Sequence, residues 1–296
     1  MPGSTTAGSA QPSTIHRCVT RGRKSDLAVG DHVSISTSSD GEGVIETYAP
    51  RASLLKRAAM HRAKLLAANA TQVAIVVAVE PSFSDEMMFR VIAAAAREAL
   101  AVLIILNKVD LPDAASAQAR LTPFVRAGHV ICELSATHDV TPLRTHLRSH
   151  RTVLVGQSGM GKSTLINALV PGAASATAEI SQFLASGRHT TTATRRYVLD
   201  DSTKDVGQGT IIDTPGMQEF GLAHLSAREI ELGFREAAPY FGQCRFSDCR
   251  HSVEPGCAVR AAMERGDFDA RAFELLGRIT AAERAAATSA PNQQRT

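Results

Sequence analysis

The strongest signal in this chain is the glycine-rich stretch Gly156-Gln157-Ser158-Gly159-Met160-Gly161-Lys162-Ser163, which fits the phosphate-binding pattern G-x-x-x-x-G-K-[ST] at every fixed position. The apolar run 152–155 leads into it, and Leu165, Ile166 and Leu169 follow at helical spacing. This order predicts a strand, a loop and a helix, which is the context that a phosphate-binding loop requires. The alternative is a glycine-rich turn that holds no ligand.

The parts of this loop have predicted tasks in holding a nucleotide. Backbone N–H groups of residues 156–162 would surround the phosphates, and the positive end of the following helix would assist them. Lys162 would bring a positive charge to the outer phosphates, and the Ser163 hydroxyl would bind Mg²⁺. Thr164 continues the loop into the helix.

A second motif, Asn107-Lys108-Val109-Asp110, lies about fifty residues upstream, directly after the apolar run 102–106. It matches the guanine-reading tetrapeptide of GTPases. Asp110 can accept hydrogen bonds from the ring N–H and the exocyclic amine of guanine, a pattern that adenine does not present. Asn107 can bond the other edge of the base, and the stem of Lys108 can cover its face. The alternative is an exposed turn after a strand.

The order of these two motifs predicts an unusual chain topology. In ordinary GTPases the phosphate loop comes first and the base-reading tetrapeptide comes last, whereas here the order is reversed. The sequence therefore predicts a GTPase core that has been circularly permuted. Ser135-Ala136, at the end of the next predicted strand, resembles the short base-contacting loop of GTPases, although a dipeptide alone is weak support.

A third motif, Asp213-Thr214-Pro215-Gly216, follows the apolar run 210–212 and fits the pattern D-x-x-G. Asp213 would hold Mg²⁺ through water, and Gly216 would place its N–H on the terminal phosphate. A threonine triplet, residues 190–192, lies between the phosphate loop and this motif. We predict that Thr191 completes the Mg²⁺ shell, with the register inside the triplet left open.

The residue after this motif is Met217, where Ras-type GTPases carry a glutamine that orients the attacking water. A thioether cannot orient water, so another group must do so or intrinsic hydrolysis must be very slow. His189, just before the threonine triplet, is the candidate because histidine donates or accepts a proton near neutrality. An exposed loop residue without a catalytic role is an equally good interpretation of His189.

Four potential metal ligands crowd into fourteen residues as Cys244-x4-Cys249-x-His251-x5-Cys257. Three thiolates and one imidazole match a closed Cys₃His structural zinc site, which leaves no open position for catalysis. The alternative is three ordinary cysteines beside a surface histidine. With five cysteines in all, this crowding indicates metal in a reducing compartment rather than disulfides.

Composition sets the broad limits. With 296 residues, 44% hydrophobic and 21% charged, the chain predicts two or three globular domains. No run of 18 apolar residues occurs, so no membrane span is expected. Residues 17–64 hold nine Lys or Arg against five Asp or Glu, which suits either contact with a polyanion or a solvated basic face.

Periodicity supplies a coarse map of the elements. Short strands are expected within 27–35 and 43–46, and a basic, alanine-rich connecting helix within 51–70. Strands of a mostly parallel sheet, with a helix at 85–100 and further helices between several strands, are expected at 73–79, 102–106, 130–134, 152–155, 196–199 and 210–212. From residue 226 onward the chain reads as helical around the cysteine cluster.

With these motifs in place, the chain resembles the RsgA (YjeQ) family of circularly permuted GTPases that act in small ribosomal subunit assembly, over roughly residues 14–280. The resemblance implies an N-terminal OB-type β barrel, a permuted α/β GTPase core and a C-terminal helical zinc-binding domain. We therefore expect a disordered start at 1–13, the barrel at 14–65, the GTPase domain at 66–225, the zinc domain at 226–288 and a tail at 289–296.

The resemblance also implies function. It implies low intrinsic GTP hydrolysis that the small subunit stimulates, and contact with the rRNA of that subunit. We expect GTP, Mg²⁺ and Zn²⁺ as cofactors, and a monomer in the cytoplasm. An apolar residue at Met217 and a catalytic histidine at His189 fit the family. One departure is that residues 1–13 do not read as the hairpin that normally opens the barrel, so either the barrel is incomplete or this chain begins differently.

Two other functions compete with this interpretation. One is a different phosphate-loop enzyme, such as a small-molecule kinase or an ATPase, which Asn107 and Asp110 argue against. The other is an RNA-binding assembly protein with a vestigial nucleotide site, which the complete set Lys162, Ser163 and Asp213 argues against.

Overall fold

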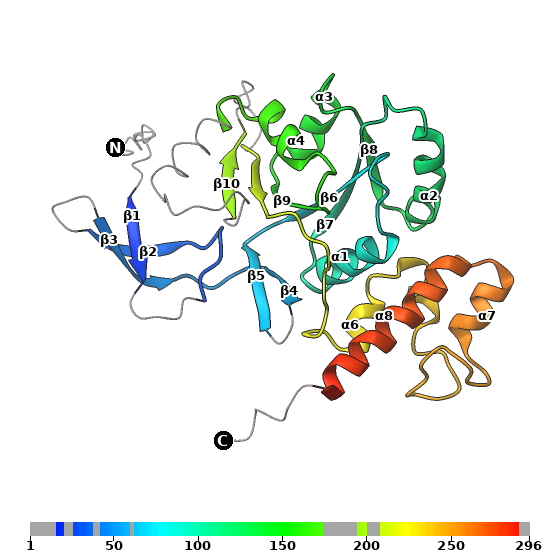
Figure 1. The fold of residues 1–296 in the computed structure, drawn as a ribbon. Coiled ribbons are helices and arrows are strands. Elements are labelled where there is room, and N and C mark those ends of the chain that lie inside the picture. The colour runs from blue at the N-terminus through cyan, green and yellow to red at the C-terminus, as the bar shows by residue number, and fades with distance from the viewer. Residues whose placement is uncertain are drawn as a thin grey trace, which may run out of the picture. The chain divides into compact units, whose positions relative to one another are not determined.

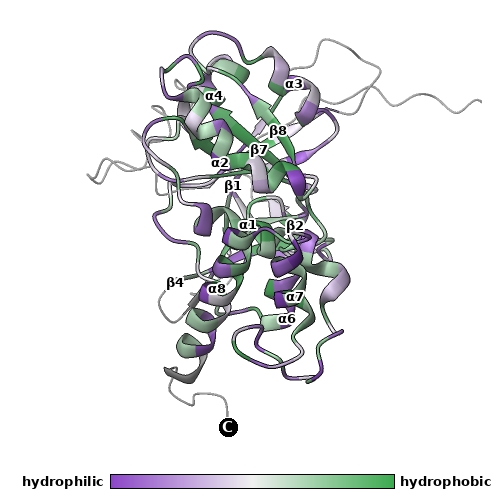
Figure 2. Cartoon of the chain, turned by 90° about the vertical axis from the view of Figure 1, so that its right-hand side faces the viewer, coloured by the Kyte–Doolittle hydropathy of each residue, from purple (hydrophilic) through white to green (hydrophobic). Residues whose placement is uncertain are grey.

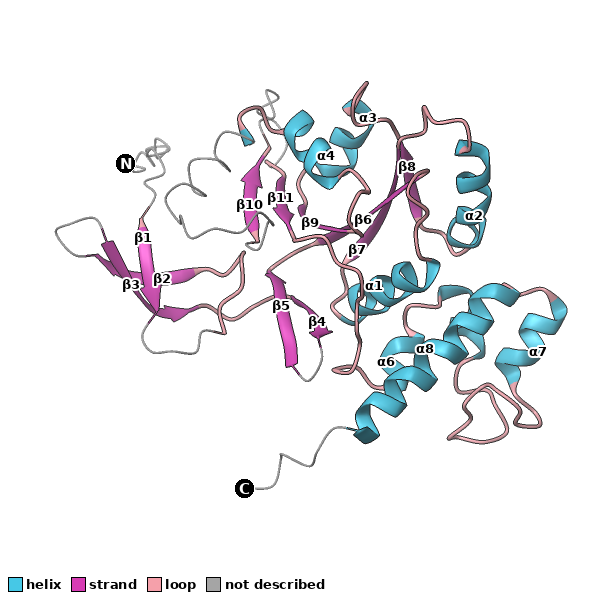
Figure 3. Ribbon diagram, viewed as in Figure 1, coloured by secondary structure: helices cyan, strands magenta, loops and turns pink. Residues whose placement is uncertain are grey.

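A computed structural model describes residues 16–20, 26–37, 42–59, 62–173, 194–199 and 208–289. Its contacts divide the chain into a smaller unit within residues 1–27 and 31–50, and a larger unit formed by residues 28–30 and 51–296. The larger unit holds every motif described above, and its elements appear in Figures 1 and 3.

A six-stranded sheet forms the centre of the larger unit, in the order β10-β11-β9-β6-β7-β8. Only the edge pair β10 and β11 is antiparallel, and the other neighbours are parallel. The strands are β6 (Gln72–Ala78), β7 (Ala101–Asn107), β8 (Val130–Glu133), β9 (Arg151–Val155), β10 (Arg195–Val198) and β11 (Thr210–Asp213). All six strands predicted from apolar runs are therefore confirmed.

The central strands are continuous hydrophobic runs because helices cover both faces of the sheet. Every residue of β6 is buried, and so are six of the seven in β7. Figure 2 shows β7 in the green of hydrophobic residues. Helices α3 (Thr141–Leu147) and α4 (Lys162–Leu169) lie on one side, and α1 (Asp85–Arg97) and α2 (Ala114–Arg126) lie on the other (Figure 1).

The parallel arrangement brings the loops that follow β7 and β9 to the same end of the sheet, the one formed by the carboxyl ends of the strands. Strand β7 ends at Asn107 and strand β9 ends at Val155, and both pair in parallel with β6 between them. Because parallel strands point their carboxyl ends the same way, the loops that follow β7 and β9 leave the sheet side by side. The reversed order of the motifs therefore does not separate them in space.

The prediction of a helix within residues 51–70 was wrong. This segment is a hairpin of β4 (Leu54–Ala59) and β5 (Arg62–Ala68), with Leu55 and Leu66 fully buried. Tertiary contacts override the helix propensity of its alanines: the Leu54 N–H donates to Glu98 Oε2 at 2.8 Å, and the Ala58 N–H donates to the Gly221 carbonyl at 2.8 Å.

The smaller unit contains a three-stranded sheet in the order β1-β3-β2, formed by β1 (Arg17–Thr20), β2 (Val33–Thr37) and β3 (Glu42–Tyr48). Strand β1 is parallel to β3, and β2 is antiparallel to it. The hairpin of β4 and β5 forms a separate two-stranded sheet. Within the residues that the structure describes, these strands do not pair into one closed barrel.

The chain after residue 226 is helical, as predicted. It contains α6 (Ala227–Glu231), the 3₁₀ helix η1 (Arg235–Tyr240), α7 (Ala258–Arg265) and α8 (Ala270–Ser289). Aromatic packing attaches this layer to α1, because the Phe89 and Phe234 rings stack with centroids 4.7 Å apart, and Phe268 meets Phe234 edge-on. Over the described ranges, no helix combines the length and apolar content needed to cross a membrane.

The core of the sheet gives a direct test of the fold. Ile104 lies at the centre of β7 and is 0% exposed, so Ile104→Ala removes buried methyl groups and leaves a cavity. We expect the free energy of unfolding to fall by about 2–5 kcal/mol, measured by urea denaturation. Val130→Ala on β8, where the side chain is 49% exposed, is the control and should cost under about 1 kcal/mol. Equal losses in both variants would contradict this arrangement of the sheet.

Candidate functional site

The phosphate loop is shaped by two positions that admit only glycine. It joins β9 to α4, and a Cβ added at Gly156 would lie 2.4 Å from the Val76 carbonyl oxygen. Gly161 has a φ of 92°, and a Cβ there would lie 2.2 Å from Nδ2 of Asn107. The loop can therefore approach both β6 and the end of β7 only because these side chains are absent.

A pocket of about 440 Å³ lies over this loop. Residues from all three motifs line it, so the structure brings them together as the sequence predicts. They are Lys108 from the tetrapeptide, the phosphate-loop residues Ser158, Gly159, Gly161, Lys162, Ser163 and Thr164, and Asp213, Thr214, Pro215 and Gly216 from the D-x-x-G loop. The upstream and downstream halves of the permuted core thus share one cavity.

Lys162 is the buried cation of this pocket. Only 8% of its surface is exposed, and Nζ donates to the carbonyls of Gly156 at 2.7 Å and Gln157 at 2.9 Å. An ammonium has three N–H donors, so this arrangement still allows a bond to a phosphate oxygen. Burial lowers the pKa of Lys162, and the nearby Asp213 carboxylate opposes that shift. Burial likewise raises the pKa of Asp213, and Lys162 opposes it.

Asn107 ties the two halves of the site together. Its side chain is 1% exposed, and Nδ2 donates to the Met160 carbonyl in the phosphate loop at 3.0 Å. Its Oδ1 accepts from the backbone N–H groups of Lys108 at 2.8 Å and Ala136 at 3.0 Å. Asn107 therefore joins three loops. The Asn107 amide carries a second N–H, which is available in principle to donate to the edge of a base. That bond stays a prediction.

The remaining base-reading candidates lie beside this junction. Asp110 is exposed and accepts a short hydrogen bond from the Ser135 hydroxyl, which is the first cause of an Asp110 pKa below its ordinary value. Lys108 Nζ donates to the Glu80 carbonyl at 2.7 Å, which holds its stem across the loop. Ser135, Ala136, Lys108 and Asp110 are thus assembled in one place, and Val109 packs half-buried against the core.

The D-x-x-G loop lies against the phosphate loop. The Met217 N–H donates to the Gly156 carbonyl at 3.3 Å, and the Thr214 hydroxyl donates to the Leu154 carbonyl at 2.6 Å. The Met217 side chain is 4% exposed, so it packs in the core and presents no polar group to the pocket. His189 and Thr191, predicted to position water and bind Mg²⁺, lie outside the described residues.

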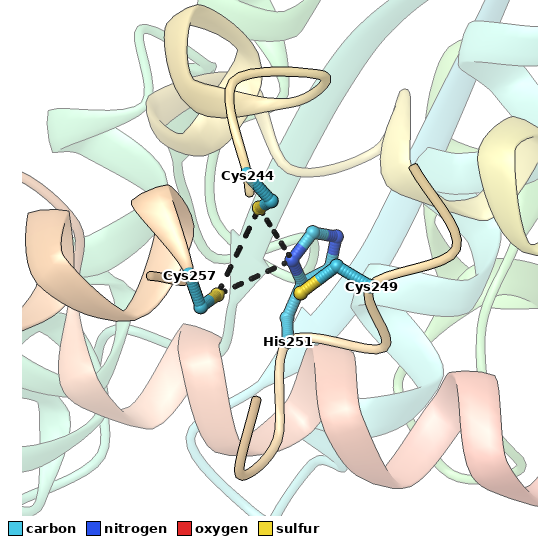
Figure 4. Close-up of side chains that lie close together, drawn as sticks. All are labelled: Cys244, Cys249, His251 and Cys257. Atoms are coloured by element: carbon cyan, nitrogen blue, oxygen red, sulfur yellow. Dashed lines mark hydrogen bonds between the residues drawn. The ribbon is translucent and has the colours of Figure 1, made fainter. Parts of the chain in front are cut away.

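The four predicted metal ligands converge at a second site (Figure 4), and their ligand atoms all lie within 4.8 Å of one another. His251 Nδ1 lies 3.5 Å from the sulfurs of both Cys244 and Cys257, and those two sulfurs are 3.9 Å apart. A tetrahedral zinc ion with Zn–S bonds of about 2.3 Å and a Zn–N bond of about 2.0 Å separates sulfurs by roughly 3.8 Å and sulfur from nitrogen by roughly 3.5 Å. The donor set and its spacing therefore fit zinc.

Sequence reasoning missed one member of this site. Glu231, at the end of α6, lies with Oε1 3.3 Å from Nε2 of His251. A carboxylate on the far nitrogen orients a ligating imidazole and leaves Nδ1 directed at the metal position. The hydrogen bond to Glu231 also raises the pKa of His251 to about 9. No spacing rule links residues 231 and 251, so only the fold reveals this contact.

The permuted sheet, the shared pocket and the glycine-rich loop define the class: a circularly permuted phosphate-loop GTPase. Comparison with known proteins agrees. The RsgA GTPase family model matches residues 48–223. Solved structures with this fold include YjeQ from Thermotoga maritima, at TM-score 0.66 and 28% identity over 90% of this chain and 89% of that one. YloQ, described as a circularly permuted GTPase, aligns at TM-score 0.62 and 25% identity over 90% and 86%.

Curated relatives give higher identities. The chain is 48% identical over 273 residues to the small ribosomal subunit biogenesis GTPase RsgA of Nitrosospira multiformis, covering 92% of this chain and 85% of the relative. It is 46% identical over 270 residues to the protein of the same name from Bordetella pertussis, covering 90% and 88%. The chain therefore belongs to the RsgA GTPase family, and it is a GTPase.

The metal site yields a prediction about zinc content. Purified protein should hold about one zinc per chain, measured by atomic emission. Cys257→Ser should lose that zinc and lower the melting temperature, because binding free energy of a structural metal adds to folding stability. Cys18→Ser is the control, since Cys18 lies in the smaller unit and outside the cluster. Wild-type protein without zinc would contradict the assignment.

Proposed function

We propose that this chain is a Mg²⁺-dependent GTPase that acts in late maturation of the small ribosomal subunit, and that the subunit stimulates its hydrolysis of GTP. The observation that carries the proposal is the single pocket lined by Lys108, Lys162 and Asp213, which come from three separated motifs. The names of its close relatives supply the subunit as the partner.

In this proposal, the phosphate loop from Gly156 to Thr164 binds the phosphates through backbone N–H groups, and Lys162 neutralises the outer ones. Ser163 and Thr191 hold Mg²⁺ directly, while Asp213 holds it through water and Gly216 donates its N–H to the terminal phosphate. When bound, Mg²⁺ neutralises charge that develops on the phosphates. The residues Asn107, Lys108, Val109, Asp110, Ser135 and Ala136 form the guanine side.

The fit of a guanine to Asp110 follows from hydrogen-bond chemistry. The Ser135 hydroxyl already orients the Asp110 carboxylate, and its hydrogen bond is the main cause that lowers the pKa of Asp110 below its ordinary value. An ionised carboxylate accepts two parallel N–H bonds, which guanine offers and adenine does not. The proposal therefore includes discrimination of GTP from ATP at this residue.

Slow intrinsic hydrolysis is part of the proposal. Met217 packs in the core, so the position that carries a water-orienting glutamine in Ras-type GTPases contributes no polar atom here. We assign water positioning to His189, which the ribosomal surface would bring into place. Hydrolysis would then time a step of assembly rather than run continuously.

The remaining parts of the proposal concern organisation and partners. We propose an OB-like barrel at 14–65, complete or truncated, that contacts rRNA, a GTPase domain at 66–225, a helical zinc-binding domain at 226–288 and a tail at 289–296. The excess of Lys and Arg in residues 17–64 supports contact with a phosphate backbone. The four ligands Cys244, Cys249, His251 and Cys257 would hold Zn²⁺ in a structural role. We further propose a cytoplasmic monomer.

GTP turnover with and without purified small subunits tests the function. We expect slow turnover alone, strong stimulation by subunits, and no turnover in either condition for Lys162→Ala. His189→Ala should lower stimulated turnover on the order of 100-fold if the histidine assists proton transfer or water positioning. Absence of turnover by wild type in both conditions would instead support an RNA-binding assembly protein with a vestigial nucleotide site.

Base recognition has its own test in Asp110→Asn. The amide replaces one acceptor with a donor, so GTP should bind on the order of 100-fold more weakly, which corresponds to about 2.7 kcal/mol. Xanthosine triphosphate should bind better than to wild type, because its carbonyl complements the new N–H. Isothermal titration calorimetry measures both. Unchanged GTP affinity, or equal competition by ATP in wild type, would rule out the role given to Asp110.

A further inference from the structure

A buried carboxylate of the C-terminal helix α8 contacts two elements of the GTPase core. Glu283 is 8% exposed, and its Oε1 accepts a hydrogen bond from the Leu222 N–H at 3.1 Å. The same oxygen pairs with the guanidinium of Arg90 on α1. Arg90 also bonds Glu86 at 3.0 Å, and Glu86 pairs in turn with Arg278 of α8.

The first contact leads back to the D-x-x-G loop. Residues 217–222 leave this loop, and the segment is fixed at both ends: the Met217 N–H bonds the Gly156 carbonyl, and the Leu222 N–H bonds Glu283. Between them Phe220 is 1% exposed, and the Gly221 carbonyl accepts from Ala58 of β4. The segment is therefore held at both ends and near its middle, and its six residues link the D-x-x-G loop to Glu283.

The second contact leads back to the phosphate loop. Gln157 of the phosphate loop accepts at its side-chain Oε1 from the Ser84 N–H at 3.0 Å. The Ser84 hydroxyl caps α1 by accepting from the Met87 N–H at 3.2 Å. Arg90 lies six residues further along this helix and pairs with Glu283. One carboxylate is therefore connected to both loops that line the phosphate end of the pocket.

We propose that Glu283 is a positioning residue for the nucleotide site: α8 sets the relative position of the phosphate loop and the D-x-x-G loop through it. This rests on the proposed function, because it takes the phosphate end of the pocket as the place where GTP and GDP differ. Movement of either loop on loss of the terminal phosphate changes the bonds made by Glu283. If GTP favours one position of α8 over another more than GDP does, a partner that binds α8 in that position raises the preference for GTP over GDP. By linkage, the nucleotide changes the affinity for that partner by the same factor.

Three variants test this role. Glu283→Ala removes both contacts, and Glu283→Gln keeps an acceptor for Leu222 but loses the charge that pairs with Arg90. Glu274→Gln is the matched control, because this glutamate lies on the same helix with a 70% exposed side chain. Turnover, KM, and the affinities for GDP and a non-hydrolysable GTP analogue are measured for each, together with the melting temperature.

We expect Glu283→Ala to reduce the ratio of GTP-analogue to GDP affinity on the order of tenfold and to lower turnover, with Glu283→Gln intermediate and Glu274→Gln unchanged. A purely structural role predicts a lower melting temperature with wild-type turnover and affinity ratio for the folded protein. That result would overturn the proposal.

A measurement on the wild-type protein guards against a variant that fails to fold. Hydrogen exchange at the Leu222 amide should differ severalfold between the GDP-bound and analogue-bound protein, and equal exchange would overturn the proposal.

Wild-type turnover distinguishes failure of the role given to Glu283 from failure of the proposed function. If wild type hydrolyses GTP and Glu283→Ala matches it, only the role of Glu283 fails. If wild type does not hydrolyse GTP, the proposed function fails, and the affinity ratio and exchange still decide the role of Glu283.

Discussion

The site depends on one close approach, the hydrogen bond between the Asn107 side chain and the Met160 carbonyl. It joins the tetrapeptide after β7 to the loop after β9, and Gly161 makes it possible because any Cβ there would overlap Asn107. The sheet brings the two loops to the same edge, but this bond sets their spacing. The two loops are therefore already held at a fixed spacing before a nucleotide binds across them. This preorganisation reduces the entropy lost on binding.

The sequence predicted those parts of the structure that depend on residues close together in the chain. The phosphate loop, the six strands of the main sheet and the zinc-type cluster all follow from residues close together in the chain. The hairpin of β4 and β5 did not, since its alanines favour a helix in isolation and only pairing with Gly221 and burial of Leu55 and Leu66 select a strand. The contacts of Glu231 with His251 and of Gln157 with Ser84 join residues far apart in sequence, so no spacing pattern predicts them.

The two sites carry charge in different ways. Around Lys162 and Asp213, burial shifts both pKa values toward the neutral forms, and each group opposes the shift of the other. Lys162 can pair with a negative phosphate and Asp213 with a positive metal ion, so the pair suits a ligand that brings charges of both signs. At the cysteine cluster, by contrast, Glu231 and His251 supply a fixed carboxylate–imidazole pair that suits a permanent ion.

The permutation also changes where the polypeptide leaves the sheet. In an unpermuted core, the strand followed by the D-x-x-G loop is succeeded by further strands, so the backbone returns into the same layer. Here β11 is the last strand among the described residues, and the chain passes from Asp213 through Leu222 into α6, η1 and the loop that carries the cysteine cluster. The permuted strand order therefore places the D-x-x-G loop directly before the carboxyl-terminal quarter of the chain, with no return to the sheet among the described residues between them.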